Sequence, residues 1–539
     1  MQSVQKIPSD KFSREKCRQV NFEEALRRTG FGKFNYFLVI LSGAVLSTVL
    51  LETLGISFIL PIAECDLNLT TKDKGMLSAI AFVGIITSSH LWGFLADTRG
   101  RRKVIMPTLF ISFFITIVSS FVKSFWLFAL LRFLSGLFIS GGSATIYAYL
   151  GEFHNLKTRS RVLMGAAFVF GVCCLCLPLV AFIVLNQEWQ IYIAVIDVYY
   201  KPWRLFMAVC GSLSAICGIC FYFLPESPKF IFATGDEEQT IKILEKIYKI
   251  NNCSVEEYNV DEILKDPDYK EACSELKNRQ ECCFCDTYKL MWNQTAPLFN
   301  KEHLKNTLVA CLVQFLIFLT SNGLYMFFPE ILNRMADYQN EKVDSSITVC
   351  GILDATRNNF HVKNETEVVD QCISKLELST YEHTFILEAL YALGFAIIGV
   401  IINYTGKLFI ILFVLFGCGS CAIALVFVTI PTLSTYLYIT LLACGLAINV
   451  VNASTIELYP TNLRAMAVCI SLMFGRLGSV FGSNLVGLLL DTHCQVTFAL
   501  SGVTLFFSGV LVFFIPNISR RSFSDDFEIP DRRASLIIK

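Results

Sequence analysis

Long apolar runs without charge recur along this chain and leave few choices of fold. The run from Val104 to Val122 has 19 residues and no charged side chain. At a helical rise of ~1.5 Å per residue it would extend about 28 Å, close to a membrane hydrocarbon core of roughly 30 Å. Hydrophobic residues make up 54% of the 539 residues and charged residues only 17%. This composition excludes a soluble globular fold and predicts an all-α membrane protein.

The apolar runs predict twelve transmembrane helices. Their expected positions are residues 34–60, 75–96, 104–122, 125–150, 162–185, 203–224, 304–328, 383–403, 408–429, 434–457, 466–490 and 495–516. An even number of spans places both termini on the same side of the membrane. The first 33 residues are polar, so we expect no cleavable signal peptide before the first span.

Basic residues predict which side is cytoplasmic. The loops after the second, fourth, eighth and tenth spans carry Arg99, Arg101, Arg102, Lys103, Lys157, Arg159, Arg161, Lys407 and Arg464. The loops on the other side carry only Lys72, Lys74, Lys123 and Lys201, with Arg204 at a helix edge. Because basic loops stay in the cytosol, we expect the first set and both termini there. The predicted domains are a cytoplasmic segment 1–33, a six-helix bundle 34–224, a cytoplasmic loop 225–303, a second bundle 304–516 with an exoplasmic loop 329–382, and a cytoplasmic tail 517–539.

An internal repeat supports the division into two pseudo-symmetric bundles. Glu152 precedes Arg159 by seven residues at the end of the fourth span, and Glu457 precedes Arg464 by the same spacing at the end of the tenth. Gly100 and Arg101, after the second span, correspond to Gly406 and Lys407 after the eighth. Parallel repeats of this kind are typical of transporters that build a site between their halves.

The segment GFLADTRGRRK, from Gly93 to Lys103, contains more than the basic residues that topology requires. Its spacing resembles the loop motif of the major facilitator superfamily, which implies the fold of that superfamily and alternating access. We expect Asp97 to form a charge-assisted network with Arg101 and Arg102, and to favour the N-terminal end of a helix in the other half. The alternative is a purely topogenic basic loop. The candidate conformational residues are Gly93, Asp97, Gly100, Arg101, Arg102, Glu152, Arg159, Glu457 and Arg464.

Polar side chains inside apolar spans are the candidate site residues. An ionised side chain at bilayer depth costs about 2.5 to 3.5 kcal/mol, so it should face a cavity or a partner. The candidates for substrate binding or proton coupling are Glu52, Arg132, Gln314, Asn322, Asn449, Asn452 and Arg476. Glu52 could bind a proton, or it could form a static ion pair with Arg132. Arg476 is the candidate for an anionic group, with helix pairing as its alternative.

Further segments resemble one family within the superfamily. PESPKF, from Pro225 to Phe230, is similar to the sugar-porter and organic-ion-transporter signature, and RFLSG begins at Arg132. The segments LPIAECDLNLTTKDKGML, PWRLF and IELYPTNLRA resemble the synaptic vesicle glycoprotein 2 family. The loop 329–382 is much shorter than the exoplasmic domain of its vertebrate members, which suggests an invertebrate member. The resemblance implies vesicle-trafficking protein partners and a vesicle membrane, while the plasma membrane stays an alternative.

Two functional hypotheses follow. The first is a secondary transporter of a small organic, ionic solute, which alternates access and could be coupled to protons. The second is a transporter-fold glycoprotein that acts in vesicle trafficking or protein interaction and moves little or no solute. The second stays open because Val49 and Asn452 stand where the resembled family carries acids. There is no phosphate-binding GxxxxGK[ST] loop, catalytic triad or zinc pattern, so we expect neither an enzyme nor a cofactor. Zero net charge suggests no nucleic-acid partner.

Surface modifications are expected on the exoplasmic side. Asn364 begins a glycosylation sequon in the loop 329–382. Four cysteines are exoplasmic, which permits oxidation: Cys65, Cys350, Cys372 and Cys494. They allow three pairings, of which Cys350 with Cys372 is the simplest, with free thiols as the alternative. The cytosolic Cys282, Cys283 and Cys285 lack a fourth ligand, so no metal site is predicted.

Overall fold

Twelve helical spans confirm the predicted membrane architecture. The computed structural model describes residues 19–252, 258–264, 292, 295–340, 347–355, 375–459 and 463–514, and within them twelve spans are long and apolar enough to cross a membrane. The first six are α3 (Lys33–Leu54) continued by α4 (Ile56–Ala63), α5 (Thr71–Arg99), α6 (Arg101–Ser119), α7 (Phe125–Glu152), α8 (Leu156–Leu185) and α9 (Pro202–Phe223). The second six are α14 (Leu304–Tyr325), α17 (Leu378–Thr405), α18 (Lys407–Phe427), α19 (Pro431–Leu442) with η2 (Ala443–Gly445) and α20 (Leu446–Glu457), α21 (Arg464–Leu489) and α22 (Cys494–Val512).

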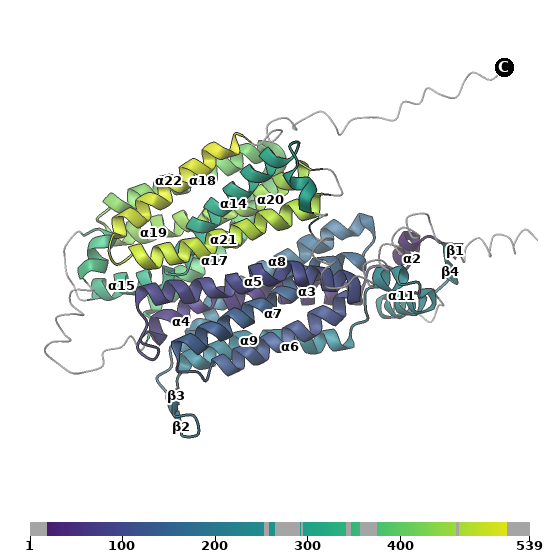
Figure 1. Cartoon of the computed structure of the whole chain (residues 1–539), viewed down its shortest axis with the longest axis horizontal. Coiled ribbons are helices and arrows are strands. Elements are labelled where there is room, and N and C mark those ends of the chain that lie inside the picture. The colour runs from purple at the N-terminus through teal and green to yellow at the C-terminus, as the bar shows by residue number, and fades with distance from the viewer. Residues whose placement is uncertain are drawn as a thin grey trace, which may run out of the picture.

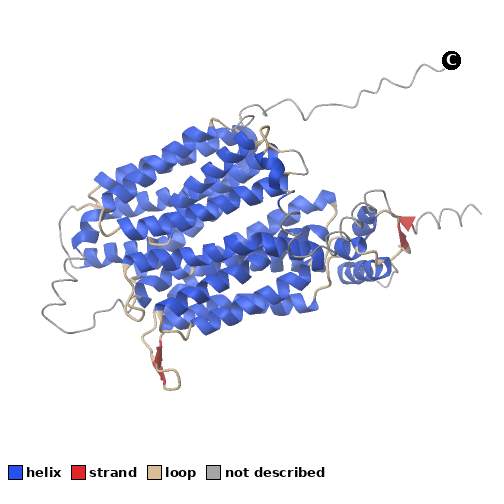
Figure 2. Ribbon diagram, in the orientation of Figure 1, coloured by secondary structure: helices blue, strands red, loops and turns tan. Residues whose placement is uncertain are grey.

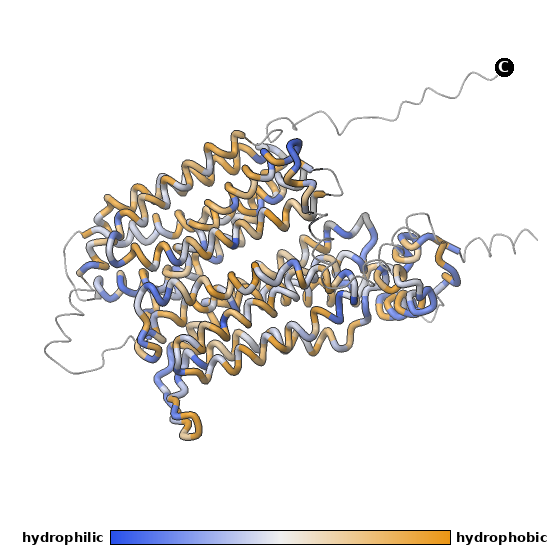
Figure 3. Tube along the Cα trace, in the orientation of Figure 1, coloured by the Kyte–Doolittle hydropathy of each residue, from blue (hydrophilic) through white to orange (hydrophobic). Residues whose placement is uncertain are grey.

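The helices form two bundles that lie side by side. Figure 1 shows α3 to α9 in one bundle and α14 to α22 in the other, with α5 and α21 at their contact. Hydrophobic residues cover most of the helices, and polar residues gather near their ends (Figure 3). Glycines let helices within a bundle approach closely: a Cβ at Gly136 of α7 would lie 2.1 Å from the carbonyl oxygen of Ala81 on α5. Small residues of this kind are the usual basis of helix packing in membranes.

Short elements outside the spans mark the two ends of the bundle. At one end lie α2 (Phe22–Arg28), α10 (Pro228–Ala233) and α11 (Glu237–Asn252), and β1 (Gln19–Val20) pairs in parallel with β4 (Glu262–Ile263). At the other end β2 (Ile191–Ile193) and β3 (Val198–Tyr200) form an antiparallel hairpin, near α4 and α15 (Phe328–Asn340). The 3-10 helix η1 (Ala296–Phe299) precedes α14. These strands are the small departures from an all-α fold (Figure 2).

We call the end that carries Arg99, Arg101 and Arg102 the basic end, and the end that carries Glu64 and Lys74 the opposite end. At the basic end, one glycine separates α5 from α6 and another separates α17 from α18. Gly100 has φ +107° and Gly406 has φ +78°, backbone conformations that L side chains rarely adopt. The two turns therefore share a similar backbone conformation with positive φ, which supports the correspondence between the halves seen in the sequence.

Candidate functional site

Glu52 and Arg132 lie together inside the first bundle. Both side chains are buried, and Arg132 Nη1 donates to Glu52 Oε2 at 2.8 Å. Arg132 also donates to the backbone carbonyl of Glu52. Thr116 of α6 donates to Glu52 Oε1 at 2.7 Å, and Ser135 of α7 to Oε2 at 3.1 Å. The carboxylate is thus surrounded by donors from α6 and α7 of its own bundle, the contact that the ion-pair alternative predicts.

Gln314 and Asn452 form a second polar contact, in the other bundle. Gln314 Nε2 on α14 donates to Asn452 Oδ1 on α20 at 2.6 Å. The Gln314 side chain is fully buried, yet its Oε1 has no hydrogen-bond partner. Asn322 donates from α14 to Ser479 Oγ on α21 at 2.9 Å, whereas Asn449 is exposed. A buried unpartnered acceptor is costly, so Gln314 Oε1 is a place where a solute donor would gain a hydrogen bond.

Arg476 lies at the contact between the halves. It stands midway along α21 and donates from Nη1 to Ser89 Oγ of α5 at 3.0 Å. Among the residues that the structure describes, no carboxylate forms an ion pair with it. A half-buried guanidinium in the middle of a membrane span, without a counter-charge, has the chemistry to hold an anion.

Part of the predicted charge network, the pair of Asp97 with Arg101, is present at the basic end. Arg101 Nη2 pairs with Asp97 Oδ1 at 2.9 Å and with Glu152 Oε1 at 3.0 Å, so it joins the ends of α5 and α7. Arg102 instead forms hydrogen bonds to α9. Its guanidinium donates to the carbonyls of Phe221 at 3.0 Å and Tyr222 at 2.7 Å. It thereby satisfies carbonyls at the end of α9, which lack partners within the helix. The turn after α5 is therefore tied to both α7 and α9.

Glu226, from the PESPKF segment, completes this network. Its Oε1 accepts from the backbone N–H of Arg102 at 3.0 Å, at the start of α6. A carboxylate at a helix N-terminus satisfies free N–H groups and interacts favourably with the helix dipole. Gly100 must approach this carboxylate closely, because a Cβ there would lie 2.5 Å from Glu226 Oε2. The sequence marked both Gly100 and PESPKF but gave no sign that they touch.

Replacing Gly100 with alanine should destabilise the protein by about 1 to 3 kcal/mol. The positive φ is strained for a side chain, and the added Cβ would push against Glu226. Thermal unfolding in detergent measures the loss. Gly171→Ala is the matched control, because it has open space around it and an ordinary φ. Equal unfolding temperatures for the two variants would contradict the role assigned to Gly100.

The remaining residues of the predicted motif differ in their surroundings. Gly93 has open space around it, so this arrangement does not require a glycine there. Arg159 lies over Gly151, where a Cβ would come within 2.7 Å of its Nε. Glu457 ends α20 as Glu152 ends α7, and Arg464 begins α21, whereas its counterpart Arg159 lies in the first turn of α8, which begins at Leu156. The side chains of Glu457 and Arg464 lie outside the described part of the chain, as do the candidate sequon residue Asn364 and the cysteines Cys282, Cys283 and Cys285.

The predicted disulfide between Cys350 and Cys372 is wrong. Cys350 is bonded to Cys494 instead, across 144 residues of sequence, while Cys372 lies outside the described residues. Cys494 begins α22, and the chain folds so that this helix start meets the segment 347–355. Proximity in the sequence therefore did not identify the partner of Cys350. Cys65 is also disulfide-bonded.

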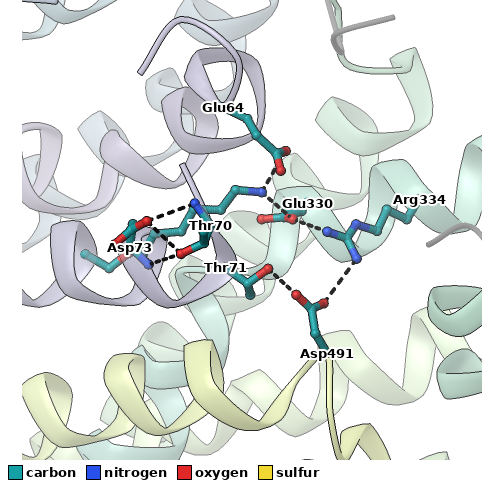
Figure 4. A network of polar contacts seen from close by, with 9 residues as sticks. Glu64, Thr70, Thr71, Asp73, Glu330, Arg334 and Asp491 are labelled. Atoms are coloured by element: carbon teal, nitrogen blue, oxygen red, sulfur yellow. Dashed lines mark hydrogen bonds and ion pairs between the residues drawn. The ribbon is translucent and has the colours of Figure 1, made fainter. Parts of the chain in front are cut away.

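Sequence reasoning missed a cluster of charges that joins the halves at the opposite end. Lys74 of α5 is fully buried and pairs with Glu330 of α15 at 2.6 Å and with Glu64 at 2.9 Å. Arg334 pairs with Glu330 at 2.6 Å and with Asp491 at 3.6 Å, and Thr71 donates to Asp491. Figure 4 shows these side chains converging from both bundles. We call this cluster the latch; it consists of Glu64, Thr71, Lys74, Glu330, Arg334 and Asp491.

The electrostatics of the latch favour charged partners. Burial alone would raise the pKa of Glu330, but Lys74 and Arg334 outweigh that effect and hold the pKa of this carboxyl below its usual value. The sequence placed Lys74 in a loop between spans. However, Thr70 and Asp73 form a capping box that begins α5 at Thr71 and so puts Lys74 in its first turn. That spacing is the signal that could have located Lys74 on a helix.

Other contacts near this end also join the halves. The half-buried Lys375 pairs with the exposed Glu188 at 2.5 Å, and the rings of Phe182 and Tyr381 lie 5.5 Å apart. At the contact of α5 and α21, a Cβ on Gly75 would lie 2.8 Å from the carbonyl oxygen of Ser483. The halves are thus held tightly together at the opposite end.

Comparison with known proteins agrees with this architecture. The profile of the Major Facilitator Superfamily matches residues 34–357. The chain belongs to this superfamily. Similar curated proteins include mouse synaptic vesicle glycoprotein 2B, 26% identical over 61% of this chain and 49% of that protein, and rat synaptic vesicle glycoprotein 2C, 24% identical over 58% and 45%. The chain thus spans about half the length of the curated relatives it matches. The predicted relationship to this family is confirmed.

Solved structures show the same fold. The inward-open xylose transporter XylE from E. coli has a TM-score of 0.61 at 14% identity, over 89% of this chain and 96% of that one. A bacterial homologue of the human lysosomal transporter Spinster, inward-facing and occupied, has a TM-score of 0.58 at 12% identity, over 89% and 96%. At these identities the likeness establishes the fold: this superfamily member is a multi-pass integral membrane protein with the transporter architecture.

Proposed function

We propose that this protein is a secondary transporter that moves a small organic anion by alternating access between its two halves. The observation that carries the proposal is Arg476, which lies midway along α21 at the contact with α5 and forms no ion pair with a described carboxylate. A solute carboxylate, sulfonate or phosphate would supply the missing charge. Gln314 Oε1 offers a free acceptor to a donor on a solute.

The proposal includes an orientation. We assign the basic end to the cytosol, because arginine and lysine accumulate in cytoplasmic loops. The latch then closes the exoplasmic side, and the solute would leave toward the cytosol from this arrangement of the halves. Glu52 and Arg132 are assigned to holding the first bundle together rather than to binding the solute, since donors of their own bundle surround them.

Replacing Arg476 with glutamine should reduce uptake of the transported anion at least tenfold. A hydrogen bond to a charged group contributes about 1.5 to 3 kcal/mol, and glutamine removes that charge. A screen of organic anions in proteoliposomes, with and without a pH gradient, measures uptake. Arg161→Gln is the control, because Arg161 is exposed. Saturable uptake that is the same in both variants would contradict the assignment of Arg476, and uptake of neutral solutes alone would contradict an anionic substrate.

A second candidate is a vesicle-membrane glycoprotein that acts through protein partners and transports little. The similarity to proteins named synaptic vesicle glycoproteins favours it. The screen separates the two candidates. If no solute is taken up but a vesicle protein binds saturably, the second candidate is supported.

A further inference from the structure

Glu388 is a buried carboxyl group that the proposed site does not use. It lies on α17, is 4% exposed, and accepts one hydrogen bond at Oε1 from the hydroxyl of Tyr325 on α14, at 2.6 Å. No cation among the described residues forms an ion pair with it. Glu52 makes the contrast clear, because that carboxylate has the guanidinium of Arg132 and two hydroxyl donors.

The groups around Glu388 are neutral. Besides Tyr325, those within electrostatic range are Tyr391 on α17 itself and Cys174 on α8 of the first bundle. The Tyr391 hydroxyl donates a hydrogen bond to the backbone carbonyl of Leu442. Cys418 of α18 and Cys444 of η2 interact electrostatically with Tyr391, and both are neutral as thiols. The charged residues of the adjacent α15 are Glu330 and Arg334, whose partners are in the latch, and Asp337, which accepts a hydrogen bond from Asn333.

The energetics of this position depend on the protonation state. An ionised carboxyl group inside a membrane protein costs several kcal/mol unless a cation or several donors compensate. Glu388 has one neutral donor. The protonated acid carries no charge, still accepts from Tyr325 at Oε1, and holds its own proton on Oε2. The arrangement seen here therefore has a low free energy for the protonated acid and a high free energy for the carboxylate.

We propose that Glu388 is a proton-binding site, occupied while α8 and α17 are packed together and emptied when these helices separate. The contact of α8 with α17 joins the two bundles, and Phe182 and Tyr381 meet in it. When it opens, water reaches Glu388, and the proton passes from Oε2 to a water molecule. When it closes, water returns a proton to Oε2. Proton binding at the opposite end therefore favours closure there.

This site deepens the proposed function, because it names a proton as the coupling ion and rests on movement of the halves. Proton binding itself can be measured without a solute. Infrared spectra of the reconstituted protein at neutral pH, in H₂O and D₂O, should contain a carboxylic acid C=O band that Glu388→Gln removes. Glu52→Gln is the matched control and should leave the band, because Glu52 forms an ion pair with Arg132. An acid band of equal intensity in the wild type and Glu388→Gln would overturn the proposal.

A second measurement tests the coupling to movement. Probes on the exposed Lys72 and Thr492, one from each half, report separation at the opposite end. Between about pH 5 and 8, a single proton shifts the ratio of open to closed molecules by up to about tenfold per pH unit. We expect this shift in the wild type and a closed, pH-independent ratio in Glu388→Gln.

The outcomes separate this inference from the proposed function. An acid band and a pH-dependent ratio that both require Glu388, in a protein that transports no solute, would retain the proton site and refute the transporter. Uptake driven by a pH gradient that Glu388→Gln leaves unchanged would retain the transporter and refute the proton site.

Discussion

Replacing Lys74 with alanine should open the opposite end of the molecule and shift the ratio of open to closed halves on the order of 100-fold. Lys74 is fully buried and is the cation through which α5 of the first bundle reaches Glu330 of α15. Breaking a buried ion pair costs about 3 to 5 kcal/mol, and the lower figure applies because Arg334 still holds Glu330. This energy is present only while the halves are closed at the latch, so its loss appears in the conformational ratio.

The measurement is the distribution of distances between spin labels on Lys72 and Thr492, which are exposed and belong to different halves. Lys123→Ala is the matched control. Lys123 also forms an ion pair at the opposite end, with Asp197 at 2.9 Å, but both side chains are mostly exposed and in one bundle. A pair of that kind contributes little. A distance distribution that Lys74→Ala leaves like that of the control would show that the latch does not hold the halves.

The latch should resist mild acid. The pKa of Glu330 is lowered in the closed state, because Lys74 and Arg334 outweigh the effect of burial. A lowered carboxyl pKa gives stability that is complete above the ordinary value of about 4 and is lost as the pH falls through the lowered value. Acidification from pH 7 to 5 should therefore leave the latch intact. Any opening or closing in that range must come from another group, which makes the Glu388 comparison interpretable.

The sequence predicted the twelve spans because hydropathy is a local property of each run. It also predicted the pair of Asp97 with Arg101 at the basic end, since these residues are four apart in the sequence and lie on either side of the turn at Gly100. The latch could not be predicted in the same way. Lys74 and Glu330 are far apart in the sequence, and their contact depends on how one bundle sits against the other. The same reason explains the disulfide, because Cys350 meets Cys494 through tertiary packing.

Glu388 was missed for another reason. The criterion that selected Glu52, an acid inside an apolar run, applies equally to Glu388 within α17. Glu388 lies within the predicted span 383–403, so hydropathy alone could have identified it as a candidate. What no sequence pattern could supply is its lack of a counter-charge, which depends on which side chains face it from α8 and α14.

Replacing Glu52 with methionine should destabilise the first bundle by about 3 to 5 kcal/mol. The variant leaves Arg132 buried without its counter-charge, although Arg132 still reaches the backbone carbonyl of residue 52. The double variant Glu52→Met with Arg132→Met should recover most of that loss, because two apolar side chains of similar volume replace the pair. Reversible unfolding in bicelles, analysed as a double-mutant cycle, measures the coupling between the two residues.

This cycle also decides between the two roles considered for Glu52. A structural pair predicts that each single variant loses stability, that the double variant recovers it, and that pH dependence of uptake is retained in Glu52→Gln. A proton-coupling carboxyl predicts the reverse: Glu52→Gln folds normally but loses the response of uptake to a pH gradient. Because donors from α6 and α7 already satisfy both oxygens of Glu52, we expect the first pattern. If Glu52→Gln is normally stable but shows no pH-driven uptake, the proton-binding role would belong to Glu52 rather than to Glu388.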